Sequence, residues 1–324
     1  MKNSRKVLLG SVLLVVAGVI SWLCYISFVL PDVGKPEYVK VGMDSSRIGR
    51  GQYLAHSVCV CMDCHSERDW NKYAGPLVEG TLGQGGEIFN QDLGFPGAYY
   101  AKNITPYGLQ HWSDGEVLRA ISSGVNKNGK ALFPVMPYLN YGKLDREDLL
   151  SIIAYIRTLS PIHKDIPESK SDFPMNLLIN AIPQRPDFKP IPDKNDRTNY
   201  GKYVFTAASC ADCHTVQTKG KPVEEMFLAG GFKFPLKTGG TVNSANITPD
   251  MQTGIGSWDE DAFLSRFKLY AAKNYKPNRV GHGEFNTLMP WLMYATMETD
   301  DLKALFTYLR TVKPVKNEVT KFIP

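Results

Sequence analysis

Two short stretches decide how the chain folds: CMDCH at residues 61–65 and CADCH at residues 210–214. Both follow the pattern C-x-x-C-H, which is typical of a covalent haem c attachment site. In that chemistry two thiols bond to the porphyrin, and the histidine that follows becomes an axial ligand of the iron. Cysteines at i and i+3 share one face of a helix, which suits attachment to one ring. The sequence therefore predicts two covalently attached haem c groups.

Two other uses of paired cysteines fit these stretches less well. A zinc site would need both pairs to meet across a long stretch of chain, and it would leave the two histidines unexplained. A redox dithiol needs a βαβ setting, of which the sequence shows no sign. We therefore interpret Cys61, Cys64, Cys210 and Cys213 as attachment residues and His65 and His214 as iron ligands.

Composition limits the class of protein. A length of 324 residues suggests two domains. The content of 43% hydrophobic and 21% charged residues is ordinary for a folded protein. The net charge of +5 comes without a cluster of basic residues, which argues against a nucleic-acid partner. Four of the six cysteines lie in the two motifs, so the sequence does not describe a disulfide framework.

The chain repeats itself after each motif. Residues 136–161, MPYLNYGKLDREDLLSIIAYIRTLSP, align without gaps to residues 289–314, MPWLMYATMETDDLKALFTYLRTVKP, with ten of 26 positions identical. Apolar residues at i, i+3, i+4 and i+7 predict one helix with a buried stripe in each copy. The stripes are Leu149, Ile152, Ile153 and Ile156 in the first copy and Leu302, Leu305, Phe306 and Leu309 in the second.

A shorter repeat precedes each motif, as GQYL at residues 51–54 and GKYV at residues 201–204. Glycine within a helix costs about 1 kcal/mol relative to alanine. Its recurrence therefore predicts a close helix crossing in both halves. Gly51 lies ten residues before Cys61 and Gly201 nine before Cys210, so the first half carries one additional residue. We interpret Cys59, in that region, as a buried thiol.

The repeat also selects the second axial ligand of each iron. Met136 and Met289 occupy the same place in the two copies, and each precedes a proline. We predict that these two thioethers bind iron. Met293 and Met297 lack counterparts in the first half and are interpreted as packing residues. Ligation by His and Met raises the potential of a haem, which suits a carrier that accepts electrons.

Two further pairs recur between motif and methionine. Asn-Ile-Thr-Pro stands at residues 103–106 and 246–249, and a tryptophan precedes a predicted helix at Trp112 and Trp258. Asn103, Asn246 and the two tryptophans are candidates for hydrogen bonds to haem propionates. Turn formation by the asparagines and core packing by the tryptophans are equally good interpretations. Ser113 and Glu116 predict a capping box at the first of these helices.

The N-terminus carries a run of 24 uncharged residues, 7–30, after Lys2, Arg5 and Lys6. Such a run is long enough to span a bilayer, and the basic flank favours a cytoplasmic N-terminus. A cleaved signal peptide is the alternative, but the apolar core is longer than usual and no small-residue cleavage pattern follows it. We predict a single-pass anchor in a bacterial cytoplasmic membrane. The rest of the chain would then lie on the periplasmic side, where haem c is attached.

These signals divide the chain into five parts. We predict an anchor at 1–30, a stalk at 31–45, a haem domain at 46–160, a linker at 161–198 and a second haem domain at 199–324. Seven prolines in the linker predict an extended connector between separate structural units. No persuasive strand pattern is present, so we expect an all-α fold of two tandem domains behind the anchor.

The motifs together resemble those of one family. The haem motif, N-I-T-P, W-S-D-G-E, F-P-V-M-P-Y and A-Y-I-R-T-L are similar to stretches of the multihaem cytochrome c subunits of membrane-bound alcohol, aldehyde and sugar-acid dehydrogenases. Those subunits typically carry three haem domains, whereas this sequence shows two and an apolar N-terminal segment. The resemblance implies domains of a few helices around each porphyrin. It also implies electron transfer without substrate chemistry of the chain's own.

The sequence and this resemblance predict a membrane-anchored dihaem cytochrome rather than an enzyme. Its expected donor is a dehydrogenase or a quinol-oxidising complex, and its expected acceptor is a cytochrome or terminal oxidase. A dihaem peroxidase or thiosulfate dehydrogenase is the alternative. A peroxidase needs an iron with an open site, and a thiosulfate enzyme commonly has a cysteine ligand, for which Cys59 is poorly placed. A scaffold subunit with structural haems is a third possibility.

Overall fold

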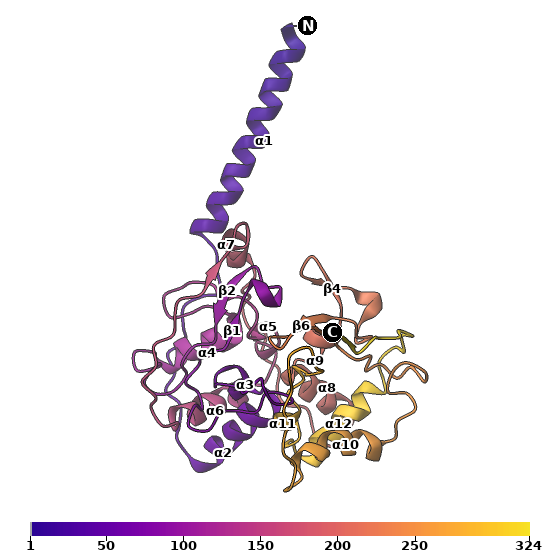
Figure 1. Cartoon of the computed structure of the whole chain (residues 1–324). Coiled ribbons are helices and arrows are strands. Elements are labelled where there is room, and N and C mark those ends of the chain that lie inside the picture. The colour runs from indigo at the N-terminus through magenta and orange to yellow at the C-terminus, as the bar shows by residue number, and fades with distance from the viewer. Residues whose placement is uncertain (1) are drawn as a thin grey trace.

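A computed structural model describes residues 2–324, with side chains from residue 6 onward. The predicted anchor forms helix α1 (Lys2–Phe28), which projects alone from one end of the folded part (Figure 1). The stretch Lys6–Phe28 is long and apolar enough to cross a membrane. The side chains of Lys2 and Arg5, on which the predicted orientation depends, lie outside the described part of the chain.

Two halves of similar build follow α1, and we call residues 45–160 the first half and residues 197–324 the second half. The elements of the first half are α2 (Ser45–Tyr53), the π-helical turn η1 (Leu54–Val58), α3 (Cys61–Cys64), β1 (Ile88–Phe89), η2 (Gln91–Leu93), β2 (Gly97–Tyr100), α4 (Asp114–Ser123), α5 (Tyr138–Tyr141) and α6 (Arg146–Arg157). Between the halves lie β3 (Lys170–Ser171), α7 (Met175–Leu178) and η3 (Ile179–Ala181). The elements of the second half are α8 (Arg197–Ala207), α9 (Cys210–His214), β4 (Gln217–Thr218), β5 (Lys221–Pro222), η4 (Glu224–Met226), β6 (Lys233–Pro235), β7 (Thr241–Asn243), α10 (Glu260–Lys268), η5 (Leu269–Ala271), α11 (Trp291–Tyr294), α12 (Thr299–Leu309) and β8 (Phe322–Ile323).

Each half is built on a crossing of two helices, α2 with α6 and α8 with α12. A Cβ atom on Gly51 would lie 1.8 Å from the carbonyl oxygen of Ser151, and one on Gly201 would lie 1.9 Å from that of Ala304. Ser151 and Ala304 are equivalent positions of the repeat. The predicted close crossing at the two glycines is therefore confirmed. The predicted apolar stripes of α6 and α12 are confirmed as well, since all eight side chains are buried.

The additional residue of the first half is absorbed inside its helix. Between α2 and α3 the chain makes a π-helical turn, closed by a bond from the Cys59 N–H to the Leu54 carbonyl (2.8 Å). The second half runs straight through α8 to Ala207. A π turn accommodates one extra residue without ending a helix. The haem motif thus begins at the same point relative to the helix crossing in both halves.

The all-α expectation is corrected by eight short strands within residues 2–324. They form the sheets β1-β2-β3 and β6-β7-β8 and the hairpin β4-β5. Each strand has only two to four residues. A strand this short cannot show the alternation of apolar and polar residues by which a sequence reveals strands. The fold is helix-rich, with the strands in the loops of the two halves, in the linker and in the C-terminal tail.

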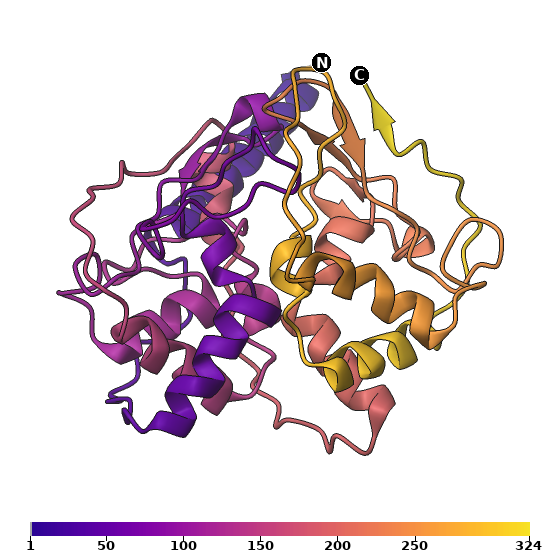
Figure 2. The same cartoon turned by 60° about the horizontal axis from the view of Figure 1, so that its bottom comes forward.

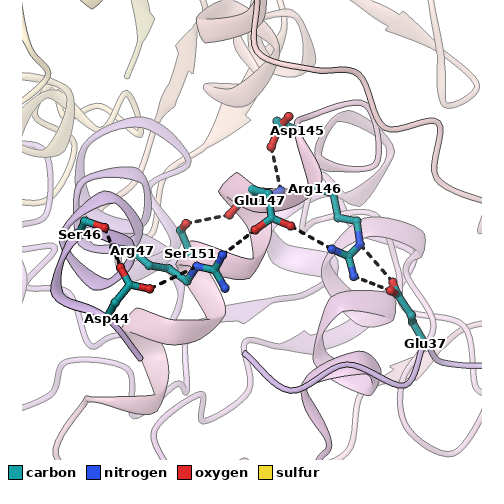
Figure 3. A network of polar contacts seen from close by, with 8 residues as sticks. All are labelled: Glu37, Asp44, Ser46, Arg47, Asp145, Arg146, Glu147 and Ser151. Atoms are coloured by element: carbon teal, nitrogen blue, oxygen red, sulfur yellow. Dashed lines mark hydrogen bonds and ion pairs between the residues drawn. The ribbon is translucent and has the colours of Figure 1, made fainter. Parts of the chain in front are cut away.

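The stalk is fastened along the first half rather than free. Asp44 caps α2 by accepting from the Arg47 N–H (2.9 Å), and the Arg47 guanidinium donates to Glu147 on α6 (2.7 Å). Arg146 pairs with Glu37 of the stalk, so ion pairs connect the stalk to both ends of this network (Figure 3). Exposed pairs of this kind stabilise a fold by less than about 1 kcal/mol each. They fix the path of the chain more than they stabilise it.

The linker contains the short elements β3, α7 and η3, and it is bonded to the first half. β3 pairs with β2, placing Ser171 opposite Gly97. Farther on, the Asp187 N–H donates to the Gly142 carbonyl (2.8 Å). The linker therefore crosses the surface of the first half before it reaches α8.

The prediction of two separate structural units is wrong, because the halves exchange polar contacts. The Tyr53 hydroxyl donates to Asp301 in the second half (2.6 Å), and the Tyr203 hydroxyl donates to Asp148 in the first (2.5 Å). Burial, followed by the facing carboxylate, raises the pKa of both tyrosines, so both hydroxyls remain protonated donors. Arg50 completes the network with a bidentate pair to Asp148 (2.8 Å).

This exchange is reciprocal, because Tyr53 and Tyr203 occupy equivalent positions, as do Asp148 and Asp301. Tyr53 of the first half contacts Asp301 of the second, and the equivalent Tyr203 of the second half contacts the equivalent Asp148 of the first. Such reciprocal contacts are the pattern of a two-fold interface. One continuous apolar core contains side chains of both halves. Figure 2 shows the helical layers of the two halves side by side. The halves form one folded body.

Candidate haem-binding sites

Each C-x-x-C-H motif forms one helical turn that starts at a left-handed residue. Val60 has φ 45° directly before α3, and Ser209 has φ 52° directly before α9. This conformation is unfavourable for most residues and for a β-branched one in particular. Its presence at the same point of both halves shows that the preceding helix must turn sharply before the first cysteine. Within the described residues, none of the four motif cysteines forms a disulfide.

The two histidines are held in the same way by a backbone carbonyl. His65 Nδ1 lies 2.7 Å from the carbonyl oxygen of Lys102, and His214 Nδ1 lies 2.7 Å from that of Ala245. A carbonyl only accepts, so Nδ1 carries the proton and Nε2 is left as the nitrogen that can bind iron. Burial lowers the pKa of both histidines, which favours the neutral ring that ligation needs.

Both carbonyls precede an Asn-Ile-Thr-Pro stretch, and this explains why the stretch recurs. Asn103 Oδ1 accepts from the N–H and hydroxyl of Thr105 (3.0 and 2.7 Å), and Asn246 Oδ1 does the same with Thr248 (2.9 and 2.7 Å). Such a side-chain turn fixes the backbone locally. The turn therefore fixes the carbonyl of the preceding residue, Lys102 or Ala245, which accepts from Nδ1 of the histidine.

The amide groups of the two asparagines are used within the chain. Asn103 Nδ2 donates to the carbonyls of Ile162 and Lys164 (2.8 and 3.1 Å), at the start of the linker. Asn246 Nδ2 donates to the Val315 carbonyl (2.8 Å) and to the Thr253 hydroxyl (3.1 Å). These bonds agree with the interpretation that Asn103 and Asn246 form turns. A haem contact of Asn103 and Asn246 stays a prediction.

Two glycines let this strand of backbone pass close to the histidine. Gly85 and Gly230 have positive φ (71° and 74°), and a Cβ atom on either would overlap the backbone beside Asn103 or Asn246. Their N–H groups donate to the carbonyls of His65 and His214 (2.8 and 2.9 Å). Each histidine is thus fixed both at its ring and at its backbone.

Met136 and Met289 are both partly buried and pack against the apolar core. Each stands before the short helix α5 or α11, and its carbonyl accepts from the N–H two residues later (2.7 Å in both). Met293 and Met297 are 8% and 1% exposed, which confirms the interpretation of both as packing residues. Iron ligation by Met136 and Met289 stays a prediction.

Tyr141 and Tyr294 are functional candidates that the sequence analysis missed. The Tyr141 hydroxyl donates to the Cys59 carbonyl (2.9 Å), and the Tyr294 hydroxyl donates to the Ala208 carbonyl (2.8 Å). Both carbonyls lie two residues before the first cysteine of a motif. Each tyrosine therefore connects the segment after the methionine to the haem motif. The signal that could have found them is that the two copies of the repeat have an identical tyrosine at this position.

The remaining predicted residues lie as follows. Trp112 and Trp258 are partly buried against the apolar core, so packing is one part of their role, and a haem contact stays a prediction. Cys59 is buried, as predicted. Among the histidines outside the motifs, His56 accepts or donates one bond with the Tyr155 hydroxyl (2.6 Å), and His111, His163 and His282 are exposed.

The donor set suits haem c. Burial raises the pKa of the Cys61 and Cys210 thiols to about 12 and that of the Cys64 thiol further. Within residues 2–324, no three His, Cys, Asp or Glu side chains gather as they do in a zinc site. Paired thiols and a neutral histidine with an available Nε2 are what a c-type haem needs for covalent attachment and for one axial ligand.

Comparison with known proteins decides the family of the second half. Residues 199–313 match the family model of cytochrome c. The chain contains a cytochrome c domain.

Similarity to curated proteins extends over most of the chain. It is 26% identical over 293 residues to the cytochrome c subunit of the quinone alcohol dehydrogenase of Gluconacetobacter polyoxogenes, covering 84% of this chain and 57% of that protein. It is 30% identical over 289 residues to the fructose dehydrogenase cytochrome subunit of Gluconobacter japonicus, covering 84% and 53%. It is 24% identical over 280 residues to the gluconate 2-dehydrogenase cytochrome c subunit of Pantoea cypripedii, covering 82% and 59%.

These relatives confirm the resemblance inferred from the motifs. By name they are cytochrome subunits of alcohol, fructose and gluconate dehydrogenases. The chain spans little more than half the length of the curated relatives that it matches.

Proposed function

We propose that the chain is a membrane-anchored dihaem cytochrome c that carries single electrons between a dehydrogenase and a downstream cytochrome or oxidase. When bound, haem c supplies one-electron redox chemistry. The observation that supports a second haem is the equivalence of the two sites. Both histidines donate from Nδ1 to a carbonyl at 2.7 Å, each directly after a C-x-x-C turn.

In this proposal the chain's own residues hold and shield the two groups. Cys61 and Cys64 bond to one group, and Cys210 and Cys213 bond to the other. The carbonyls of Lys102 and Ala245 prevent rotation of the histidine rings, and Met136 and Met289 supply the opposite ligand. Thioether ligation favours the reduced iron and so suits acceptance of electrons from a dehydrogenase.

The proposed donor and membrane location have separate support. Three relatives are named as cytochrome subunits of alcohol, fructose and gluconate dehydrogenases, which supports a dehydrogenase as donor. The 23-residue apolar stretch Lys6–Phe28 supports anchoring, because most of its apolar side chains are exposed and only Ile26, near its end, is buried against the folded part. The haem halves would then face the periplasm.

Haem counting tests the central part of this proposal. The full chain, made in a host that attaches haem c, should carry two covalent haem groups by intact mass and by pyridine haemochrome absorbance. The double variant Cys61→Ala with Cys64→Ala should carry one, and so should Cys210→Ala with Cys213→Ala. A wild-type ratio of one haem per chain would contradict the proposal.

Spin state and turnover separate a carrier from an enzyme. Both irons should be six-coordinate and low-spin as isolated, with negligible turnover of peroxide or thiosulfate. A high-spin haem, together with peroxide turnover lost on substitution near that iron, would overturn the carrier function.

For the anchor, membrane fractionation and N-terminal sequencing should find α1 retained; a soluble protein that starts near residue 31 would contradict it.

A further inference from the structure

The linker turns back to the end of α1 before it continues to the second half. α7 and η3 contact the last turns of α1 (Figure 1). Ile26 is 2% exposed, although most apolar side chains of α1 are exposed. The Asn180 side chain donates to the Ile26 carbonyl (3.3 Å), and Arg185 pairs with Asp32 directly after α1 (3.0 Å). Residues 173–182 are therefore held against the end of α1.

This segment is unusually apolar for an exposed linker. Residues 173–184, FPMNLLINAIPQ, contain no charge, and Asp172 and Arg185 stand on either side. Phe173 is 80% exposed and Leu178 is 37% exposed. Met175, Leu177 and Ile179 of the same segment are partly exposed. Exposed apolar side chains gathered in one segment mark a surface that contacts another phase or molecule. The segment is continuous with the apolar surface of α1, so the same partner can cover both.

The length of α1 sets the depth of this contact. A helix of 23 residues is about 35 Å long at 1.5 Å per residue, whereas the hydrocarbon core of a bilayer is about 30 Å thick. If Lys6–Phe28 spans the membrane, its last turn lies at the boundary with the head groups. Trp22 and Tyr25 are exposed near that end, as is typical of side chains at this boundary. A segment packed on Ile26 lies at the same depth.

We propose that residues 173–182 lie in the head-group region of a phospholipid bilayer, as a second membrane contact beside α1. The inference rests on the proposed anchoring by α1. A single helix leaves the folded part free to rotate about it, whereas a second contact fixes which face meets the membrane. The β4-β5 hairpin, with exposed Lys219 and Lys221, lies on the same end of the folded part (Figure 1). Basic side chains there attract anionic head groups.

Labelling from within the bilayer tests the contact. The full haem-loaded chain is reconstituted in vesicles of phosphatidylcholine and phosphatidylglycerol and exposed to a lipid-soluble carbene reagent. Peptides are then mapped by mass spectrometry. Labelling of residues 173–182 and of α1 should exceed that around Leu269 several-fold. Leu269 is a suitable reference because it is apolar and 56% exposed but follows α10, at the end of the folded part opposite α1.

A charge variant sharpens the test. Phe173→Glu with Leu178→Glu should lower labelling of the rest of the segment several-fold, while Leu269→Glu should leave it unchanged. Haem content and visible spectra of both variants should match the wild type. Labelled α1 beside an unlabelled segment in the wild type would overturn the inference and leave the anchor intact. If neither were labelled, the proposed anchor itself would be wrong and the inference would fall with it.

Discussion

The two halves reach the same geometry around the haem motif by different routes. In the second half, α8 runs as a regular helix to Ala207, whereas the first half inserts the π turn Leu54–Val58. In both, a tyrosine hydroxyl donates to the carbonyl two residues before the first cysteine. The difference shows which distances matter. The helix crossing and the haem motif are fixed relative to each other, and the helix between them adapts.

The halves also differ in the residues of the segment between the crossing glycine and the haem motif. Counted from the crossing glycine, His56 of the first half corresponds to Thr206 of the second. Counted back from the first cysteine of the motif, Cys59 corresponds to Ala208. His56 lies near the interface between halves and bonds to Tyr155, whereas Thr206 bonds to the carbonyl one turn earlier in its own helix (2.8 Å). The crossing glycine and the haem motif are equivalent in the two halves, and the differences lie in the segment between them.

The largest expected effect concerns the helix crossing. Gly51→Ala should destabilise the protein by about 3 kcal/mol, because the new Cβ would overlap the Ser151 carbonyl. Gly49→Ala is the matched control in the same helix, since it has no heavy atom within 4 Å, and it should stabilise the helix by roughly 0.5–1 kcal/mol. Denaturant unfolding of the haem-loaded protein measures both. Equal effects of the two substitutions would mean that the crossing is not close.

The proposed axial ligands, Met136 and Met289, give the next effect. Met136→His should lower the potential of the first haem by on the order of 0.1 V, because nitrogen ligation favours the oxidised iron. Since the halves share a core and a buried network, we also expect a smaller shift of the second haem. Spectroscopic redox titration of Met136→His and of Met289→His measures each haem in turn. An unchanged spectrum in Met136→Ala would remove this ligand assignment.

The exchanged tyrosines test whether the halves act as one body. Tyr53→Phe and Tyr203→Phe should each cost about 1.5 kcal/mol, the value of a hydrogen bond to a charged group. Both carboxylates keep other partners: Asp148 keeps Arg50, and Asp301 keeps Tyr200. Tyr38→Phe, at a fully exposed site, should change nothing. Two separate unfolding transitions in the wild type would contradict the single body.

The smallest effect distinguishes the halves by pH. Burial lowers the pKa of His56 below its ordinary value of 6.5, so the unfolded chain binds more protons between the two values. The free energy of unfolding should therefore fall as pH drops through 6.5. The change should be below about 1 kcal/mol, because the ring is partly exposed. His56→Thr, which copies the second half, should reduce this slope in the haem-loaded protein, where His65 and His214 are expected to bind iron; an identical slope in the variant would rule His56 out as its source.

Much of the fold was predictable because the chain is duplicated. The apolar stripes, the crossing glycines and the capping box at Ser113 and Glu116 all follow from local patterns, and the structure has each of them. The domain boundaries remain predictions, although the cytochrome c match begins at residue 199, where the second domain was expected to start. The similarity to dehydrogenase cytochrome subunits was also predictable from the motifs.

The parts that were not predictable depend on contacts between distant residues. The histidine partners are backbone carbonyls of Lys102 and Ala245, whose side chains carry no signal. The exchange of Tyr53 and Tyr203 between halves could not be inferred, because a repeat shows equivalent positions but not which half each one contacts. The strands were missed because two to four residues are too few to show a pattern.

The reciprocal network has a consequence for the history of such a chain. A contact in which each half offers the same surface to the other is the contact that two identical copies would make. A single-haem ancestor that paired with itself would already possess it, and duplication followed by fusion would need only a linker. The prolines between the halves, laid along the surface of the first, are such a linker. On this view the two halves correspond to the two subunits of a symmetric dimer, joined into one polypeptide.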